Sequence, residues 1–280
     1  MGVHPNQQKP ILVLGGTGKT GRRVAERLTA SGLPVRIGSR SGQPSFDWSN
    51  PATWTPALDD VGAVYIAYYP DVAAPGGVEA VSAFANVAVA NGVRRLVLLS
   101  GRGEPESEEA EAAVRASGAD LTILRATWFA QNFSEGYLRD PVLGGAIALP
   151  AGDVREPIVD VDDIAEVAVA ALTEARHGGE LYEITGPRLL HFSEVAAELA
   201  AASGQPVEYV PITLAQFHAA MTEIGGAFIA DVFTHVCEEA LDGRNEWLGD
   251  GVQRALGRAP RDFSEFCRRA AAAGAWRKAA

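Results

Sequence analysis

The sequence predicts an α/β protein with a doubly wound parallel sheet and a smaller, mainly helical C-terminal lobe. Short, continuously apolar runs alternate with longer stretches of helical periodicity over the first 130 residues. A glycine-rich turn, GGTGKTG at 15–21, separates the first apolar run from the first helical stretch. Strands that are buried on both faces and joined by helices form parallel sheets with right-handed crossovers, which is the Rossmann-type arrangement.

Strand and helix alternate through the first half of the chain. Continuous apolarity marks the strands, whereas apolar residues at helical spacing, such as Val24, Ala25 and Leu28, mark the helices. Gly32 ends the first helix, and Asn50 followed by proline opens the next as an N-cap. The expected strands cover 11–14, 35–38, 63–68, 95–100 and 121–125, and the expected helices cover 19–31, 50–58, 78–91 and 106–117.

Beyond residue 130 the alternation loosens and helices dominate. We expect helices at 162–173, 192–202, 214–224, 230–241 and 262–273, and one more core strand at 180–185. The sheet core therefore covers 1–130, with strand 180–185 added, and 131–280 forms the second lobe, interleaved with the core. We expect this lobe at the carboxyl edge of the strands, where doubly wound sheets bind ligands.

Composition limits what the protein binds. The 280 residues carry a net charge of −11 without a basic cluster, so we expect no direct binding to nucleic acid. No apolar run approaches the roughly 18 residues of a membrane span, and the N-terminus does not resemble a secretory signal, so we expect a cytoplasmic protein without a membrane partner. Cys237 and Cys267 are far apart, and no residue set has metal-ligand spacing, so we expect reduced thiols and no metal.

The glycine-rich turn admits two interpretations, because GKT also ends the loop of nucleoside triphosphatases. That loop has the spacing G-x-x-x-x-G-K-[ST], and the place of its first glycine is taken by Val13, inside the strand. The chain instead has G-x-x-G-x-x-G, with Gly15 for a tight turn, Gly18 for close approach of a pyrophosphate and Gly21 for close helix packing. The helix N-terminus offers N–H groups to a dinucleotide. A purely structural turn is the alternative.

The end of the second strand distinguishes the two nicotinamide dinucleotides. NAD-binding folds of this type place an acid there for the ribose 2′-hydroxyl, whereas this chain has Ser39 and Arg40 and no acid before Asp47. Arginine binds a 2′-phosphate through two charge-assisted hydrogen bonds, and Lys19 and Arg22 are near enough to assist. We therefore expect NADP(H) as the cofactor; a solvent-facing Arg40 is the alternative.

Five segments support a resemblance to a known family. They are VLGGTGKTG at 13–21, SFDW at 45–48, LVLLSG at 96–101, LTILRATWFAQNF at 121–133 and REPIVDVDDIAEVA at 155–168. In this order they resemble NmrA-like proteins, which are atypical short-chain dehydrogenases/reductases. The resemblance covers about 11–270 and is closest to the agroclavine-dehydrogenase branch, whose loop and FDW segments read much alike.

The resemblance implies a set of site residues. The pyrophosphate of the cofactor would contact the glycine-rich turn at Gly15, Thr17, Gly18, Lys19, Thr20 and Gly21. The adenosine phosphate would contact Ser39 and Arg40, with Asp47 and Trp48 near adenine and Ala67 and Tyr68 at the ribose. The nicotinamide ring would lie beside Ser100, Ala126 and Thr127. The substrate pocket would comprise Tyr68, Trp128, Phe129 and Asn132. For Trp128 and Phe129, core packing is the alternative.

The Tyr-x-x-x-Lys pair of the better-known members of this superfamily is absent. No tyrosine, at 65, 68, 69, 137, 182 or 209, has a lysine four residues on. The segment between the fourth and fifth strands carries Glu106, Glu108, Glu109 and Glu111, for which we expect a solvated helix face, with a general acid as the alternative. Reducing a ketone requires a proton donor, whereas hydride neutralises an iminium carbon and a quinone spreads the charge. The catalytic residues therefore stay unknown.

These observations predict an NADP(H)-dependent oxidoreductase that transfers hydride directly to a small activated acceptor, quinone-like or iminium-like. The alternative is a non-catalytic, NAD(P)-binding regulator of the NmrA type. Aromatic residues of the second lobe, including Phe217 and Phe233, and the loop 68–77 favour a pocket and hence catalysis. We expect His218 and His235 to be packing residues, and the architecture is compatible with a homodimer.

Overall fold

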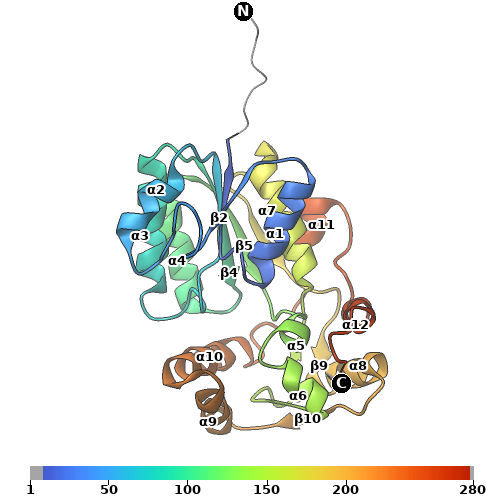
Figure 1. Ribbon diagram of the computed structural model, residues 1–280. Helices are drawn as coiled ribbons and strands as arrows, with labels where there is room; N and C mark the ends of the chain where they lie inside the picture. Colours follow the sequence, from blue (N-terminus) through green and yellow to red (C-terminus); the bar gives the residue numbers. More distant parts are fainter. Residues whose placement is uncertain (1–8, 278–280) are drawn as a thin grey trace, which may run out of the picture. The chain divides into compact units, whose positions relative to one another are not determined.

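The computed structural model describes residues 9–277, which divide into two compact units (Figure 1). The first unit comprises the described residues up to Ser100, together with Glu106–Leu124 and Ala165–Leu181. The second comprises Gly101–Pro105, Arg125–Ile164 and the described residues from Tyr182 onward. Among the residues described, no helix is long and apolar enough to cross a membrane.

A six-stranded sheet, most of which lies in the first unit, has the strand order β2-β1-β3-β4-β5-β8. The strands are β1 Ile11–Leu14, β2 Val35–Gly38, β3 Ala63–Ile66, β4 Arg95–Gly101, β5 Asp120–Ala126 and β8 Leu181–Ile184. β1 pairs in parallel with β2 and β3, and β3 pairs in parallel with β4. β1 and β3 are buried along their whole length, so both faces of the sheet need cover.

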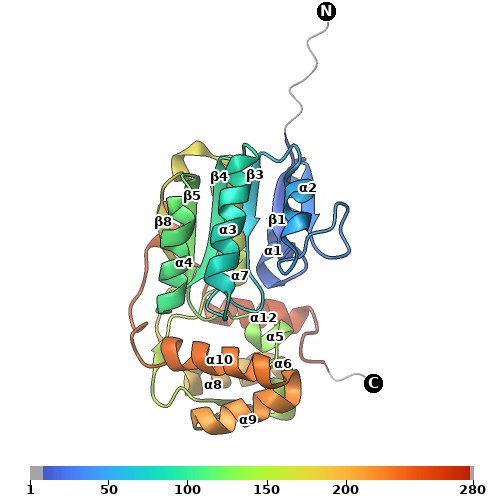
Figure 2. The same ribbon diagram turned by 90° about the vertical axis from the view of Figure 1, so that its left-hand side faces the viewer.

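Helices supply that cover on both faces of the sheet. They are α1 Lys19–Ala30, α2 Trp54–Leu58, α3 Gly77–Ala90, α4 Pro105–Ala116 and α7 Val161–Thr173. α2, α3 and α4 lie on one face, and α1 and α7 lie on the other (Figures 1 and 2). The doubly wound sheet expected from the sequence is thereby confirmed.

Two expected elements of the first unit differ in detail. The expected strand 63–68 ends at Ile66, two residues earlier. The segment beyond it leads to Pro70, whose nitrogen carries no hydrogen for a strand ladder. The expected helix at 50–58 begins as a 3₁₀ turn, Pro51–Thr53, in which the Asn50 side chain accepts a hydrogen bond from the Ala52 nitrogen at 3.3 Å.

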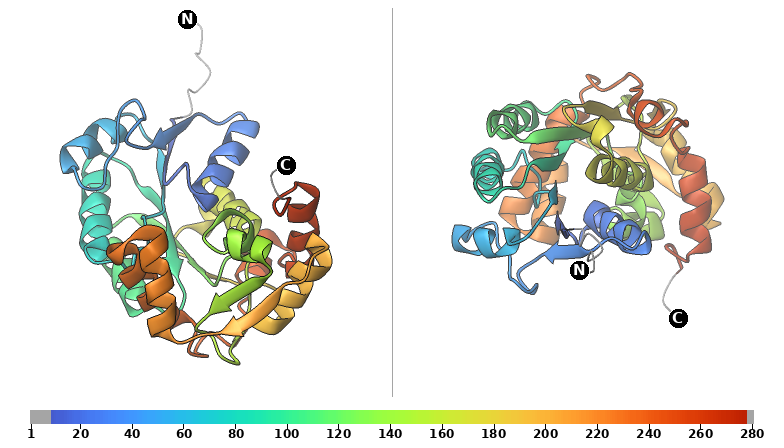
Figure 3. Two further views of the ribbon diagram at one scale, coloured as in Figure 1. Left: turned by 60° about the horizontal axis from the view of Figure 1, so that its bottom comes forward. Right: turned by 90° about the horizontal axis from the view of Figure 1, so that it is seen from above.

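The second unit is mainly helical and contains two small sheets. Its helices are α5 Asn132–Glu135, α6 Arg139–Gly144, α8 Phe192–Ser203, α9 Leu214–Gly225, α10 Ala227–Ala240, α11 Gly251–Leu256 and α12 Phe263–Ala272. β6 Ala146–Leu149 pairs in parallel with β10 Glu208–Pro211, as Figure 3 shows, and β7 Arg155–Glu156 pairs in antiparallel fashion with β9 Leu190–His191. β7 and β9 have only two residues each, too few for a periodic signal in the sequence.

Aromatic side chains dominate the core of the second unit. The Phe133 and Phe263 rings lie 5.8 Å apart edge-to-face, and the Trp128 and Phe192 rings lie 6.2 Å apart in the same arrangement. Each large ring contributes a large apolar area to the core. The indole nitrogen of Trp276 donates to the Phe133 carbonyl at 2.8 Å, which attaches the end of the described chain to this core.

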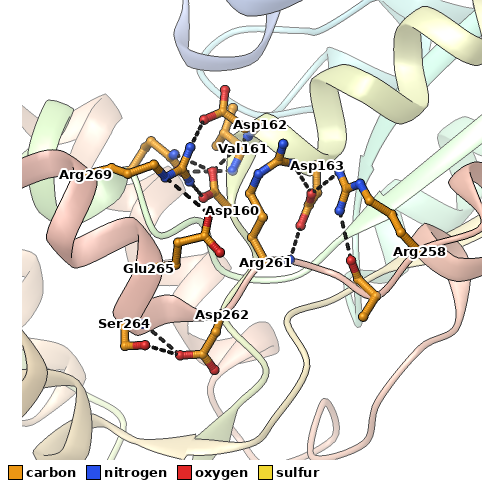
Figure 4. A network of polar contacts seen from close by, with 12 residues as sticks. Asp160, Val161, Asp162, Asp163, Arg258, Arg261, Asp262, Ser264, Glu265 and Arg269 are labelled. Atoms are coloured by element: carbon orange, nitrogen blue, oxygen red, sulfur yellow. Dashed lines mark hydrogen bonds and ion pairs between the residues drawn. The ribbon is translucent and has the colours of Figure 1, made fainter.

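A network of carboxylates and arginines connects the start of α7 with the segment that leads into α12 (Figure 4). Asp163 is fully buried and accepts hydrogen bonds from Arg258 Nη2 and from the Arg261 backbone nitrogen, both at 2.7 Å. The Arg261 guanidinium also pairs with Asp163, and Arg269 pairs with Asp160. This network therefore fixes the α12 segment within the second unit.

Candidate functional site

The glycine-rich turn between β1 and α1 is closed by contacts that exclude larger side chains. Gly15 has a φ of +66°, a conformation that favours glycine, and a Cβ there would lie 2.9 Å from the Ala67 carbonyl oxygen. A Cβ on Gly21 would lie 2.3 Å from the Gly15 carbonyl oxygen. Gly16, which sequence reasoning passed over, would meet Ile37 Cγ2 at 2.9 Å, although the GG pair at 15–16 was a visible signal.

The N-terminus of α1 is open at this turn. Gly18 is the N-cap, in an extended conformation, and no side chain caps the helix. The first turn contains no acidic residue, and Thr17 and Gly18 are exposed. Because the first N–H groups of a helix have no partner within it and carry its positive dipole end, this turn fits the diphosphate of a dinucleotide.

The segment after β2 carries the residues expected near the adenosine phosphate. Arg40 is exposed, and its positive charge helps to lower the pKa of the Asp47 carboxyl. Ser39 is half-buried, with its hydroxyl 3.4 Å from that of Ser41. Asp47 accepts hydrogen bonds from the Ser49 hydroxyl and backbone nitrogen at 2.8 and 2.9 Å, and these bonds lower the pKa of its carboxyl.

Aromatic rings of the first unit gather around the expected adenine and ribose residues. Trp48 and Tyr68 lie with their ring centroids 5.0 Å apart, and Phe46 approaches Trp48 at the same distance. Both Trp48 and Tyr68 stay half-buried, and partial burial raises the pKa of the Tyr68 phenol. The structure thus brings together Trp48 and Tyr68, and likewise Gly15 and Ala67, from separate segments of the chain.

The acidic helix α4 departs from the expected solvated face at two residues, because Glu106 is half-buried and Glu111 is buried. Glu108 and Glu109 are exposed, as expected for a solvated face. Glu111 is only 4% exposed, and its Oε1 accepts a hydrogen bond of 2.6 Å from the Ser100 hydroxyl. The interpretation of Glu111 as solvated is therefore wrong: it faces β4, where the buried Ser100 hydroxyl needs an acceptor.

Residues 126–132, expected near nicotinamide and substrate, lie at or after the end of β5 and belong to the second unit. The Thr127 hydroxyl donates to the Pro157 carbonyl at 2.7 Å, and Ala126 is buried. Trp128 is 8% exposed and belongs to the aromatic core, whereas Phe129 is half-buried and forms a bridge with Val159. Asn132 opens α5, where its backbone nitrogen donates to the Phe129 carbonyl at 3.0 Å.

His218, expected as a packing residue, lies at the surface of the second unit. Its side chain is 40% exposed, and Nε2 lies 2.8 Å from Asp231 Oδ1, so that the pair joins α9 to α10. His235 is half-buried on α10. Within residues 9–277, no group of three or more His, Cys, Asp or Glu side chains could hold a metal ion.

Sequence reasoning also overlooked two buried charged residues, Arg102 directly after β4 and Glu156 at the end of β7. Arg102 is 3% exposed, its guanidinium lies 3.4 Å from the centroid of the Trp247 ring, and its Nε forms an ion pair of 3.2 Å with Glu183. Glu156 is completely buried, and its Oε1 accepts a hydrogen bond of 3.3 Å from the Trp128 backbone nitrogen. For Glu156, the signal in the sequence was a charged residue beside Arg155 at the start of the mainly apolar segment REPIVDV.

A glycine turn at an uncapped helix N-terminus, after the first strand of a parallel sheet, defines a dinucleotide-binding protein of the Rossmann type. Residues 15–175 match the NAD(P)H-binding family, and the chain belongs to that family. The cofactor is therefore NAD(P)H, and the expected cofactor class is confirmed.

Individual relatives agree with this assignment. The chain is 33% identical over 285 residues to the NAD(P)H azoreductase of Xenophilus azovorans, covering 94% of this chain and 98% of that protein. It is 31% identical over 283 residues to the agroclavine dehydrogenase of Claviceps fusiformis, a match that covers 91% of this chain and 95% of that protein. The expected similarity to the agroclavine-dehydrogenase branch is thereby confirmed, and the chain is an NAD(P)H-dependent oxidoreductase.

A solved structure shows the same fold. The NADPH-dependent quinone oxidoreductase of Escherichia coli, complexed with NADPH, superposes with a TM-score of 0.69 at 23% identity. The match covers 92% of this chain and 99% of that one. This likeness concerns the whole fold, including the sheet that carries the glycine turn.

Proposed function

We propose that the chain uses NADP(H) to reduce a small activated acceptor, quinone-like or iminium-like, by direct hydride transfer. The single observation that carries the proposal is the glycine turn, in which a Cβ on Gly15 or Gly21 would occupy space that the backbone fills. The first unit, which carries this turn, then holds the diphosphate of the cofactor.

The residues that hold the cofactor follow from their places in the first unit. Backbone groups of 15–21 bind the diphosphate at the N-terminus of α1, with Lys19 adding a positive charge. Ser39 and Arg40 bind the adenosine phosphate, and Trp48 and Tyr68 border adenine and ribose. When bound, the cofactor supplies hydride, so that the protein has to position an acceptor and exclude water.

The choice of NADP(H) over NAD(H) rests on Arg40. Arg40 is exposed, and its positive charge acts on the nearby Asp47 carboxyl, whose pKa it helps to lower; its exposure leaves it accessible to a 2′-phosphate. Arg40→Ala should raise the KM for NADPH by roughly tenfold or more, the loss of a charge-assisted contact, and leave the KM for NADH nearly unchanged. Arg94→Ala, an exposed arginine next to the start of β4, is the matched control. An equal effect of Arg40→Ala on both cofactors would defeat the assignment.

Chemistry and relatives support an activated acceptor. No tyrosine in the sequence has a lysine four residues on, so the usual proton donor for a ketone is absent. Two proteins similar to this chain are named NAD(P)H azoreductase and agroclavine dehydrogenase, which supports a redox reaction on a substrate other than a simple ketone.

The decisive assay follows NADPH consumption with quinones, cyclic iminium ions and azo dyes, beside NADPH binding by fluorescence. The proposal predicts turnover on at least one of these classes. Tight binding of NADPH without turnover on any of them would contradict it and favour a regulator that binds the cofactor without using it.

A further inference from the structure

A cavity opens at the amino ends of the strands in the first unit. It has a volume of about 350 Å³ and lies between the starts of four neighbouring strands, β1, β3, β4 and β5, and the last turn of α7. All of its lining residues belong to the first unit. Because the glycine turn follows the carboxyl end of β1, the cavity and the turn lie at opposite ends of that strand.

The floor of the cavity is apolar, and small residues leave room above it. Ile11, Ala63 and Arg95 stand side by side in register on β1, β3 and β4, so their side chains share one face of the sheet. Ala63 is the smallest of this row, and Gly62 before it has no side chain. Ile11, Ala63 and Leu172 of α7 are all buried. The hollow therefore offers an apolar surface to part of a ligand.

Positive charge dominates the rim of the cavity. Lys9, Arg94 and Arg95 line it together with a single carboxylate, that of Asp120, so the lining side chains carry a net charge of +2. The whole chain, in contrast, has a net charge of −11. A concave surface with charge of one sign attracts ligands of the other sign. The cavity therefore favours an anion.

The contacts that these side chains already make leave donors for a ligand. Lys9 pairs with Asp60 at 3.4 Å, but both side chains are more than half exposed, so the pair contributes little. Arg95 Nη1 donates to the Leu172 carbonyl at 3.2 Å, which offsets the negative end of the α7 dipole, and its Nε lies 3.9 Å from Asp120. A guanidinium has five N–H groups, so Arg95 keeps donors for a further group.

Arg94 presents an accessible guanidinium on a fixed main chain. Its side chain is exposed at the rim of the cavity. Its backbone carbonyl accepts a hydrogen bond of 2.7 Å from the Asp120 nitrogen, which ties the start of β4 to the start of β5. Arginine binds a phosphate group through two parallel, charge-assisted hydrogen bonds. Arg94 is therefore placed to receive a phosphate group at the mouth of the cavity.

We propose that this cavity binds a small phosphate monoester, a second site that is independent of the proposed function. The phosphate group lies against Lys9, Arg94 and Arg95, and the ester group lies on the apolar floor around Ala63. A phosphate monoester carries close to two negative charges above about pH 7, which matches the net charge of the lining. The volume lies at the lower end of the range for ligand pockets, so the ligand is small.

Titration of the full chain with phenyl phosphate, followed by two-dimensional NMR, tests the site. At low salt we expect a Kd of about 1 mM or below. The backbone amide signals of 62–63, 94–95 and 172–173 should shift, and saturation with NADP+ should leave the affinity unchanged. Absence of binding would overturn the inference. So would competition by NADP+ or shifts confined to 15–21, because phenyl phosphate would then occupy the glycine turn.

Two variants test the charge and the shape of the cavity separately. Arg94→Ala should weaken phenyl phosphate binding by about tenfold, the loss of one charge-assisted contact, and Arg115→Ala, an exposed arginine in the last turn of α4, is the matched control. Ala63→Ile keeps every charge but fills the hollow, so a folded variant should no longer bind. Equal losses in the two arginine variants would show long-range attraction without a site. A folded Ala63→Ile protein that binds as the wild type does would show that the ligand lies outside the cavity.

Two simpler anions test the class of ligand. Inorganic phosphate has the charge without an apolar group, and benzoate has an apolar ring with a single charge. Each should bind about tenfold more weakly than phenyl phosphate, since each lacks one of the two contacts. Inorganic phosphate that binds as tightly would show that the apolar floor makes no contact, and benzoate that binds as tightly would show that the rim does not select a phosphate. Either result would overturn the assignment to a phosphate monoester.

Discussion

The N-termini of α1 and α7 present the same physical feature and use it differently. α1 begins at Gly18 with no side-chain cap and no acidic residue in its first turn. α7 begins after Asp160, whose Oδ1 accepts a hydrogen bond of 2.9 Å from the Asp162 backbone nitrogen, and its first turn contains two acids. Both ends carry N–H groups and a positive dipole. One is therefore available to an anionic ligand, and the other is occupied by the protein's own carboxylates.

The difference shows how to distinguish a binding helix end from a structural one. At α7 the carboxylates are themselves neutralised, since Asp163 pairs with Arg258 and Arg261 within the second unit (Figure 4). At α1 the polar groups of the turn are backbone groups on glycines, which leave room for a ligand. The acids in the first turn of α7 are thus part of its anchorage, whereas the glycine turn before α1, placed after the first strand of the sheet, leaves its N–H groups to an anion.

The largest effect should come from breaking the α7 anchorage. Asp163→Asn removes a buried negative charge that faces two guanidinium groups. The free energy of unfolding should fall by about 3 kcal/mol, the low end of the range for breaking a buried ion pair, because both arginines are partly exposed. Urea unfolding measures the loss. Asp140→Asn, at an 85%-exposed carboxylate paired with Arg139, should change it by less than about 1 kcal/mol. Losses of equal size at the two sites would show that Asp163 is not an anchor.

A smaller effect is expected where α1 meets its turn. In Gly21→Ala the new Cβ would lie 2.3 Å from the Gly15 carbonyl oxygen, so helix and turn must move apart. Overpacking of this kind costs about 2 kcal/mol, which corresponds to a roughly 30-fold weaker affinity if the strain falls on the cofactor site. NADPH titration followed by fluorescence measures it. Gly144→Ala, where a Cβ meets nothing within 4 Å, is the control and should bind as the wild type does.

Much of the first unit could be predicted from the sequence because its short strands are continuously apolar and alternate with helices of clear periodicity. The strands β1 and β2 and the helices α1 and α3 appear within a residue or so of their expected limits, since apolar runs and helical spacing dominate there. In the second unit the two-residue strands β7 and β9 left no periodic signal. Their pairing depends on contacts between residues far apart in the sequence.

The candidate site likewise contains residues that the sequence predicts and residues that it does not. The glycine turn could be predicted because spacing alone determines which positions must be glycine. Glu111 could not, because its helix begins with acids at exposed positions, and only the packing of α4 on β4 directs Glu111 toward Ser100. Glu156 lies in a segment whose local pattern does not reveal that Trp128, from a distant element, would be its hydrogen-bond partner.

The central claim is that the N-terminus of α1 is kept free for the diphosphate, and one titration tests it most directly. Gly18 has the extended conformation of an N-cap, so Gly18→Asp should cap α1 as Asp160 caps α7, stabilise the protein by a few tenths of a kcal/mol and place a carboxylate in the anion site. NADPH affinity, measured calorimetrically, should then fall by about 100-fold or more, whereas Gly18→Asn, which caps without a charge, should lose much less. A folded Gly18→Asp protein that binds NADPH as tightly as the wild type would contradict the account.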